Sequence, residues 1–323
     1  MTYLPGANRA TAIDAALDEM GVARTDGPDT YVSNARFPDG AAYRIEIPST
    51  EGPECLEAVL EEADRLDVPV TRVSQGSGVS MLTDAELDRM ARVAASAGVE
   101  VSLFARPGAG WGPSTSARAP AGAGLAAASW GQDQVRRCLE DVLRAASHGF
   151  RSVLLADVGV LAAFAELRRR GGLPADMQAK ISVMLPVANP ASAKVLVNLG
   201  AGTLNVPGDL GLGQLAAIRR SVTVPIDLYV ESPDELGGLV RLGEVPDLIR
   251  VAAPLHVKLG LRNAPSLYPY GRHLAPTAVA MCRERVRRAR LVMELLERES
   301  IDVKASMPGA DGLALPVPRK TQA

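Results

Sequence analysis

The chain has 323 residues, of which 47% are hydrophobic and 4% aromatic, and its 35 Lys and Arg against 37 Asp and Glu give a formal net charge of −2. These values are typical of a soluble globular protein. The near-neutral balance argues against a broad nucleic-acid-binding face and a polybasic membrane anchor, because both need an excess of basic residues. The length suits a single α/β barrel, which takes roughly 250 residues.

The sequence predicts a protein of the cytoplasm. Its N-terminus is polar and amphipathic, without the apolar core of a secretory signal, and no run of about 18 apolar residues occurs. The three cysteines, Cys55, Cys138 and Cys282, are widely spaced and form no CxxC pair. We therefore expect neither a disulfide framework nor a structural zinc site, and a reducing compartment is the simplest setting.

In chain order, residues 1–40 are predicted as a short helix and an irregular arm, and eight β-rich runs follow. The runs cover residues 43–48, 68–74, 100–106, 151–157, 180–186, 202–207, 224–231 and 247–252. Amphipathic helical patterns lie between them, and a long helix at 276–297 would complete the outer layer. The last residues, 300–323, are predicted as a flexible tail.

Strands that alternate with helices form parallel βαβ units, and eight such units close into a (β/α)8 TIM barrel. We predict this barrel over residues 41–299. The competing architecture is a doubly wound open sheet, but no glycine-rich dinucleotide fingerprint follows the first β-rich run.

The longest irregular segment covers residues 107–131, after the third β-rich run. A loop of this length inside a compact domain is usually functional or disordered. Its position at the C-terminal end of the barrel, its glycines, and Trp111 and Trp130 favour a lid over the active site. A mobile insertion without a role is the alternative.

The predicted barrel interior is unusually polar. Alternate strand residues face the axis, and that side normally carries Val, Ile and Leu. Near the bottom of the barrel, Arg44, Lys180 and Asp227 are predicted to form a structural ion-pair network, because buried charges must be paired. Polar residues nearer the C-terminal mouth are predicted to face a functional cavity: Glu46, Ser74, Gln75, Arg106, Asp157, Asn205, Glu231 and Arg250. Arg72 of the second run fits the inward side as well.

Two carboxylates stand out near the mouth. Glu46 and Glu231 lie on the first and seventh runs, which come close together when the barrel closes. They could share a divalent metal ion or serve as general acid and base. They could equally be neutralised by Arg72 and Arg250.

The segment 253–270 is predicted as the loop after the eighth strand, where barrels often hold phosphate or carboxylate groups. Arg262 offers a bidentate fork and Lys258 a point charge. A Schiff-base role for Lys258 would need its pKa lowered by burial. His256 is either a catalytic residue or a satisfied loop histidine, and Asn263 is a further polar candidate.

The candidate site therefore has two groups of residues. The catalytic candidates are Glu46, Glu231, His256 and Lys258, with Glu46 and Glu231 as metal candidates. The substrate-binding candidates are Arg72, Ser74, Gln75, Arg106, Asn205, Arg250, Arg262 and Asn263.

From about Arg44 to Arg298 the chain resembles the collagenase-like U32 peptidase family, in particular a compact actinobacterial branch. The resemblance rests on RIEIPSTEGP (44–53), RVSQGSGVSMLTDAE (72–86), the block SVMLP…GAGTLNVPGDLGLGQLAAIR (182–219), VPIDLYVE (224–231) and APLHVKLGLRNAP (253–265). It implies a barrel and an enzyme of the peptidase or the RNA- and quinone-hydroxylation type. The hydroxylating members hold an iron–sulfur cluster with four cysteines, whereas this chain has three cysteines and none in the loop after the seventh run. We therefore expect no cluster.

The leading hypothesis is an enzyme, a hydrolase or lyase, that acts on a small anionic substrate by acid–base or metal-assisted chemistry. Peptide-bond hydrolysis, as the family name implies, is one alternative. The other is a non-catalytic barrel that binds a metabolite or partner. The arginine-rich helix at 276–297 could then be the surface of a homo-oligomer, or simply a solvated face.

Overall fold

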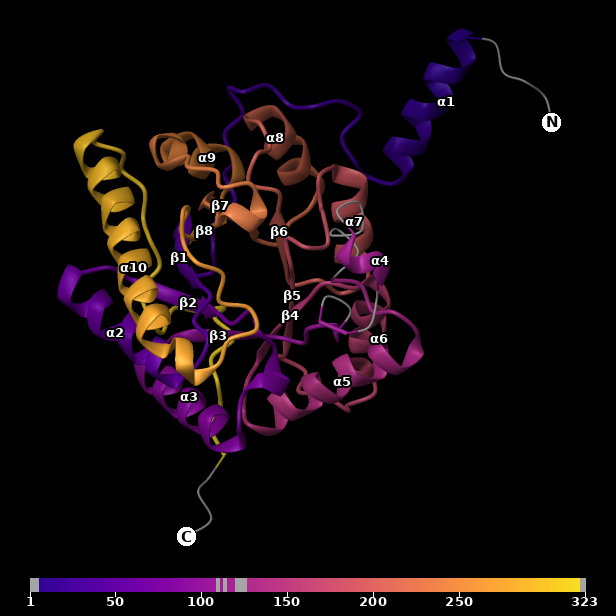
Figure 1. Ribbon diagram of the computed structural model, residues 1–323. Coiled ribbons are helices and arrows are strands. Elements are labelled where there is room, and N and C mark those ends of the chain that lie inside the picture. The colour runs from indigo at the N-terminus through magenta and orange to yellow at the C-terminus, as the bar shows by residue number, and fades with distance from the viewer. Residues whose placement is uncertain (1–5, 109–110, 113–114, 120–126, 320–323) are drawn as a thin grey trace.

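The chain folds into a closed barrel of eight parallel strands, which confirms the predicted (β/α)8 architecture (Figure 1). The computed structural model describes residues 6–108, 111–112, 115–119 and 127–319. Each strand pairs with the next along the chain, and β1 pairs with β8 to close the ring. The strands are β1 Tyr43–Pro48, β2 Val70–Ser74, β3 Glu100–Phe104, β4 Ser152–Leu155, β5 Gln178–Ile181, β6 Thr203–Val206, β7 Ile226–Glu231 and β8 Leu255–Leu259.

Helices surround the strands, and α1 stands away from the barrel (Figure 1). The α3 helix shows why the sequence forms them: Thr83 and Glu86 make the reciprocal bonds of a capping box at its start, and its apolar positions recur on one buried face. The helices are α1 Gly6–Glu19, α2 Pro53–Leu66, α3 Asp84–Ala97, α4 Thr115–Arg118, α5 Gln132–Ser147, α6 Val158–Arg169, α7 Pro190–Asn198, α8 Leu212–Ser221, α9 Val245–Ala252 and α10 Ala275–Arg298. None of the helices in the described part of the chain is both long and apolar enough to cross a membrane.

The apolar core lies between the strands and the helices. Ile45, Ile47 and Val73 are fully or almost fully buried in this layer together with apolar residues of the covering helices. The alternation of the strands then turns their polar neighbours towards the barrel axis, as predicted.

The prediction of the eighth strand at 247–252 is wrong. These residues belong to the helix α9, and the strand that closes the barrel is Leu255–Leu259. A short apolar run does not distinguish strand from helix, but Pro246 in the first turn favours a helix start. Arg250 consequently lies outside the barrel, where its Nη2 is 2.7 Å from Asp247 Oδ1 and its Nη1 donates to the Tyr31 carbonyl.

The segment after residue 300 is not the flexible tail that the sequence predicted, at least as far as residue 319. It crosses the N-terminal end of the barrel, where Ala305 forms a parallel bridge with Tyr43 at the start of β1. Farther along, the Ala314 amide donates to Glu100 Oε2 at 3.1 Å. The Val317 amide donates to the Gly149 carbonyl at 2.8 Å. These contacts close the bottom of the barrel.

Gly149 lets this segment dock, so Gly149→Ala is expected to release it. Its φ is +95°, and an added Cβ would lie 2.1 Å from the Val317 carbonyl oxygen. We expect a loss of about 1–3 kcal/mol in the free energy of unfolding and faster limited proteolysis between residues 300 and 319. Gly171→Ala is the matched control, because Gly171 also has a positive φ, +76°, but nothing within 4 Å of the added Cβ. Equal proteolysis of both variants would contradict this account.

Candidate functional site

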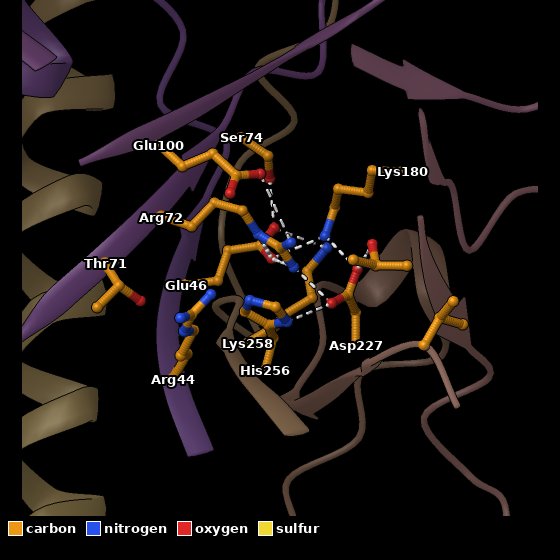
Figure 2. A network of polar contacts seen from close by, with 12 residues as sticks. Arg44, Glu46, Thr71, Arg72, Ser74, Glu100, Lys180, Asp227, His256 and Lys258 are labelled. Atoms are coloured by element: carbon orange, nitrogen blue, oxygen red, sulfur yellow. Dashed lines mark hydrogen bonds and ion pairs between the residues drawn. The ribbon is translucent and has the colours of Figure 1, made fainter. Parts of the chain in front are cut away.

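Charged side chains from six strands meet inside the barrel, with Glu100 of β3 at the edge, 3.7 Å from Arg72 (Figure 2). Glu46 of β1 is the centre of this cluster, which we call the interior network. Its Oε2 accepts from Arg72 Nε and from Lys180 Nζ, both at 2.7 Å. Its Oε1 accepts from Ser74 Oγ at 2.8 Å and lies 3.1 Å from Lys258 Nζ. Because β1 and β5 lie on opposite sides of the ring, the contact between Glu46 and Lys180 crosses the barrel axis.

Asp227 of β7 is the second carboxylate of the interior network. It accepts from Arg72, from Lys180 Nζ at 2.5 Å and from Thr203 Oγ1 at 2.9 Å. Burial opposes ionisation of Glu46 and Asp227, but the charges of Arg72 and Lys180 outweigh it and hold the pKa of both carboxyls well below their usual values. The network therefore exists as paired ions at neutral pH.

Two basic groups of the network are themselves perturbed. Burial, reinforced by the charge of Arg72, lowers the pKa of Lys180 to about 8 and that of His256 to about 3. His256 is thus neutral at physiological pH, with its Nδ1 2.8 Å from Asp227 Oδ1. It lies below the mouth of the barrel, on a strand and not on the loop that the sequence suggested.

The predicted ionic network includes Lys180 and Asp227, but Arg44 points away from it. Arg44 Nε donates to Ser306 Oγ at 2.9 Å and its Nη2 to the Asp311 carbonyl at 2.6 Å. Its guanidinium also stacks on Phe37 at 4.1 Å. Arg44 therefore anchors the C-terminal segment at the bottom of the barrel.

A cavity of about 270 Å³ opens above the interior network, at the C-terminal ends of the strands. Five sequence candidates contribute to its lining: Ser74, Gln75, Arg106, Asn205 and Lys258. The structure adds polar groups that sequence reasoning did not name as candidates, namely Ser49, Ser182, Tyr229, Glu235 and Tyr268, and apolar walls that include Phe104, Trp111, Leu154 and Met184.

Lys258 joins the network to the cavity. Its side chain is 2% exposed, and its Nζ lies 3.1 Å from Glu46 Oε1 and 4.4 Å from the centre of the Tyr229 ring. With the Asn205 amide oriented to donate to the Asp227 carbonyl, its oxygen accepts from Lys258 Nζ at 2.9 Å. The ammonium is thus fixed at the floor of the cavity by a carboxylate, an amide and an aromatic face.

Arg106 supplies a second cation, on the cavity wall. Its Nη1 donates to the Gly76 carbonyl at 3.1 Å, and its guanidinium stacks on the rings of Trp111 at 4.5 Å and Phe104 at 5.4 Å. Burial lowers its pKa from the usual value. No carboxylate of the described residues lies within ion-pair distance of it, and the charges of Glu51 and of Glu235, which also lines the cavity, act on it only from farther away.

Glu231 is placed apart from Glu46 and does not line the cavity. Its Oε1 accepts from the Arg262 amide at 3.0 Å, and its Oε2 lies 3.2 Å from Arg288 Nε on α10. The pairing of β7 with β8 is irregular between Tyr229 and Glu231, which breaks the alternation on which the sequence placement relied. The structure therefore does not bring the two candidate metal ligands together, and no three His, Cys, Asp or Glu side chains in the described ranges are grouped to hold a metal ion.

The remaining substrate-binding candidates lie elsewhere. Arg72 is buried beneath the cavity within the interior network, and Arg250 is on the outer helix α9. The Arg262 side chain is 61% exposed, 3.8 Å from Asp234, and the Asn263 amide donates to the same carboxylate. Asp157 caps α6 by accepting from the Val160 amide.

Two loops each add an aromatic side chain to the cavity lining, Tyr268 and Trp111. Strand periodicity could not predict either residue, because neither lies on a strand. Tyr268 belongs to the chain after β8, yet its hydroxyl hydrogen-bonds Ser49 after β1. It packs so closely on Gly76 that an added Cβ there would lie 2.5 Å from its ring. From the predicted lid at 107–131, Trp111 lines the cavity, while residues 109–110, 113–114 and 120–126 lie outside the described residues.

The arginines of α10 that could have formed an oligomer surface are paired within the chain. Arg283 Nη2 lies 2.6 Å from Glu61 of α2, Arg288 contacts Glu231, and Arg290 pairs with Glu294 and Glu297. The helix packs closely against α2.

No family model and no curated protein matches this sequence. Among solved structures, a truncated 3-deoxy-D-arabino-heptulosonate 7-phosphate synthase from Thermotoga maritima is 14% identical over 85% of this chain and 91% of its own, with a TM-score of 0.45. Thiamine phosphate pyrophosphorylase from Pyrococcus furiosus is 12% identical, over 79% of this chain and 98% of its own, at 0.44. A U32 peptidase is 14% identical, over 87% and 89%, at 0.38. None of these similarities identifies a family or an activity for this chain.

Proposed function

We propose that this protein is an enzyme that binds a small carboxylate or phosphate substrate in the cavity at the C-terminal end of the barrel. The observation that carries the proposal is Arg106, a guanidinium without a carboxylate partner among the described residues, on the wall of a cavity whose floor is Lys258. Arg106 is half-buried, and a cation partly withdrawn from water is stabilised by an anionic ligand.

The shape and chemistry of the cavity suit such a ligand. Its volume of about 270 Å³ is near the lower end of small-molecule sites, which span roughly 300–1,000 Å³. A guanidinium recognises carboxylate and phosphate groups by two parallel hydrogen bonds. The stacking of Arg106 on Trp111 and Phe104 holds the guanidinium in place and limits the access of water.

Lys258 is the proposed catalytic residue, as a proton donor or acceptor towards the bound substrate. Glu46 is a positioning residue, because it contacts Lys258 Nζ but does not line the cavity. Peptide-bond hydrolysis, which the family resemblance implies, has no arrangement of described cavity residues in its favour. His256 and Glu231 have no part in the proposed site.

Binding by Arg106 can be tested with a thermal-shift and calorimetric screen of carboxylated and phosphorylated metabolites. For ligands that stabilise the wild type, Arg106→Met is expected to weaken binding by about 10–100-fold, because a charge-assisted bidentate contact is lost. Arg262→Met is the matched control, since this exposed arginine was an equal candidate from the sequence. Binding that depends on Arg262 and not on Arg106 would contradict the proposed site. Elemental analysis of the same preparations would report any bound metal.

A further inference from the structure

We infer that Lys258 is a nucleophile that forms a protonated imine with a carbonyl substrate, and that the same substrate carries a carboxylate or phosphate held by Arg106. This inference rests on the proposed function of the cavity and names its substrate class: small anionic aldehydes or ketones.

The position of Lys258 distinguishes it from the other buried lysine. Both lysines contact Glu46, but Lys180 is held between Glu46 Oε2 at 2.7 Å and Asp227 Oδ2 at 2.5 Å and does not line the cavity. Lys258 is the lysine that lines the cavity as far as the structure describes it, and its polar contacts are Glu46 Oε1 and Asn205. These two contacts leave one of its three N–H positions for a substrate.

The surroundings of Lys258 suit attack by its amine. Arg72, Lys180 and Lys258 all contact the carboxylate of Glu46, although Arg72 and Lys180 also pair with Asp227. A lysine beside other cations is a recurrent form of activated amine nucleophile. Glu46 Oε1, 3.1 Å from Nζ, positions the amine at the floor of the cavity, and the proton that must leave before attack passes to solvent in the cavity.

The reaction balances without a co-reactant. The Lys258 ammonium loses one proton to solvent, and the lone pair of Nζ forms a bond to the carbonyl carbon while the C=O π electrons move to oxygen. A second proton then passes from nitrogen to that oxygen, which gives the hydroxyl of a carbinolamine. That hydroxyl then takes up a proton and leaves as water while the C=N bond forms. The ammonium and the carbonyl thus yield a protonated imine and water, with no net change of charge and no oxidant or reductant.

Arg106 would select the substrate by its second functional group. A ligand anchored by its anionic end on the wall holds its carbonyl in the cavity against Lys258, which converts a bimolecular encounter into an oriented one. A neutral carbonyl compound lacks this anchor. Imine formation is therefore expected to favour anionic carbonyl compounds and to depend on Arg106.

Borohydride trapping tests the inference directly. The full-length protein is incubated with pyruvate, dihydroxyacetone phosphate or neutral acetaldehyde, reduced with sodium borohydride, and analysed by intact and peptide mass spectrometry. We expect a reduced adduct on the peptide that contains Lys258, with at least one of the anionic probes and at lower concentration than with acetaldehyde. Arg106→Met should lower the yield by about tenfold or more at limiting probe.

Variants separate the roles further. Lys258→Arg keeps the charge beside Glu46 but cannot form an imine, so it should lose the adduct, whereas the matched control Lys194→Arg on α7 should keep it. If Lys258→Arg fails to fold, peptide mapping of the wild-type adduct still decides the site. Adducts spread over other lysines, or equal trapping of acetaldehyde, would overturn the inference. The absence of any adduct would overturn it too, while Arg106-dependent anion binding would leave the proposed function standing.

Discussion

Glu46→Gln is expected to lower the free energy of unfolding by about 3–5 kcal/mol, the usual cost of breaking a buried ion pair from one side. Glu46 is completely buried. Its carboxylate accepts hydrogen bonds from Arg72, Lys180 and Ser74 and forms an ion pair with Lys258. The neutral amide would leave Lys258 without its carboxylate partner, and Arg72 and Lys180 with fewer carboxylate contacts, those to Asp227 and, for Arg72, to Glu100. Urea unfolding followed by circular dichroism measures the change.

Two comparisons make this result specific to the network. Glu166→Gln removes an exposed carboxylate that pairs with Arg169 and Arg170, and it should leave the unfolding midpoint nearly unchanged. Adding Lys180→Met to Glu46→Gln removes a cation together with the carboxylate and should recover part of the lost stability. A Glu46→Gln variant as stable as the Glu166→Gln variant would show that the buried ions are not coupled in solution.

His256 is expected to make the protein less stable as the pH falls below about 6.5. Burial and the charge of Arg72 lower the pKa of folded His256 from 6.5 to about 3, so between these values the unfolded chain binds a proton that the folded chain does not. The contribution of His256 to the free energy of unfolding therefore falls by about 1.4 kcal/mol for each unit by which the pH decreases in this range.

Comparison with His256→Asn isolates this effect from other groups. Asp141 acts in the opposite direction, because burial raises its pKa to about 6 and the folded chain then binds the extra proton. Glu46 and Asp227 add their own loss of stability only as the pH falls below their ordinary values of 4.5 and 3.8. As the pH falls from 6.5 to 4.5, the free energy of unfolding of His256→Asn should therefore rise relative to that of the wild type by about 1.4 kcal/mol per pH unit. Unfolding curves measured at each pH give this difference. A difference independent of pH would refute the assignment.

Local patterns in the sequence are the reason that some cavity residues could be predicted. Ser74 ends β2, and Arg106 follows β3 by two residues, so parallel strands in a barrel carry both to the same end. Asn205 faced inward by alternation along its run. Lys258 is a candidate from its charge and its place near the predicted mouth, but the sequence predicts a loop there because the helix at 247–252 has the short apolar run of a strand.

Periodicity and the order of strands and helices were enough to predict the barrel and the polar character of its interior. Which charges meet could not be predicted, because the contacts form between strands that are far apart along the chain. The contact of Glu46 with Lys180 depends on closure of the ring, and the separation of Glu231 from Glu46 depends on one irregular register in β7. Tyr268 and Trp111 reach the cavity from loops whose path no local pattern fixes. The net charge of −2 therefore hides an uneven arrangement of charged residues. Some of them form the paired network inside the barrel, and two cations, Lys258 and Arg106, line the cavity.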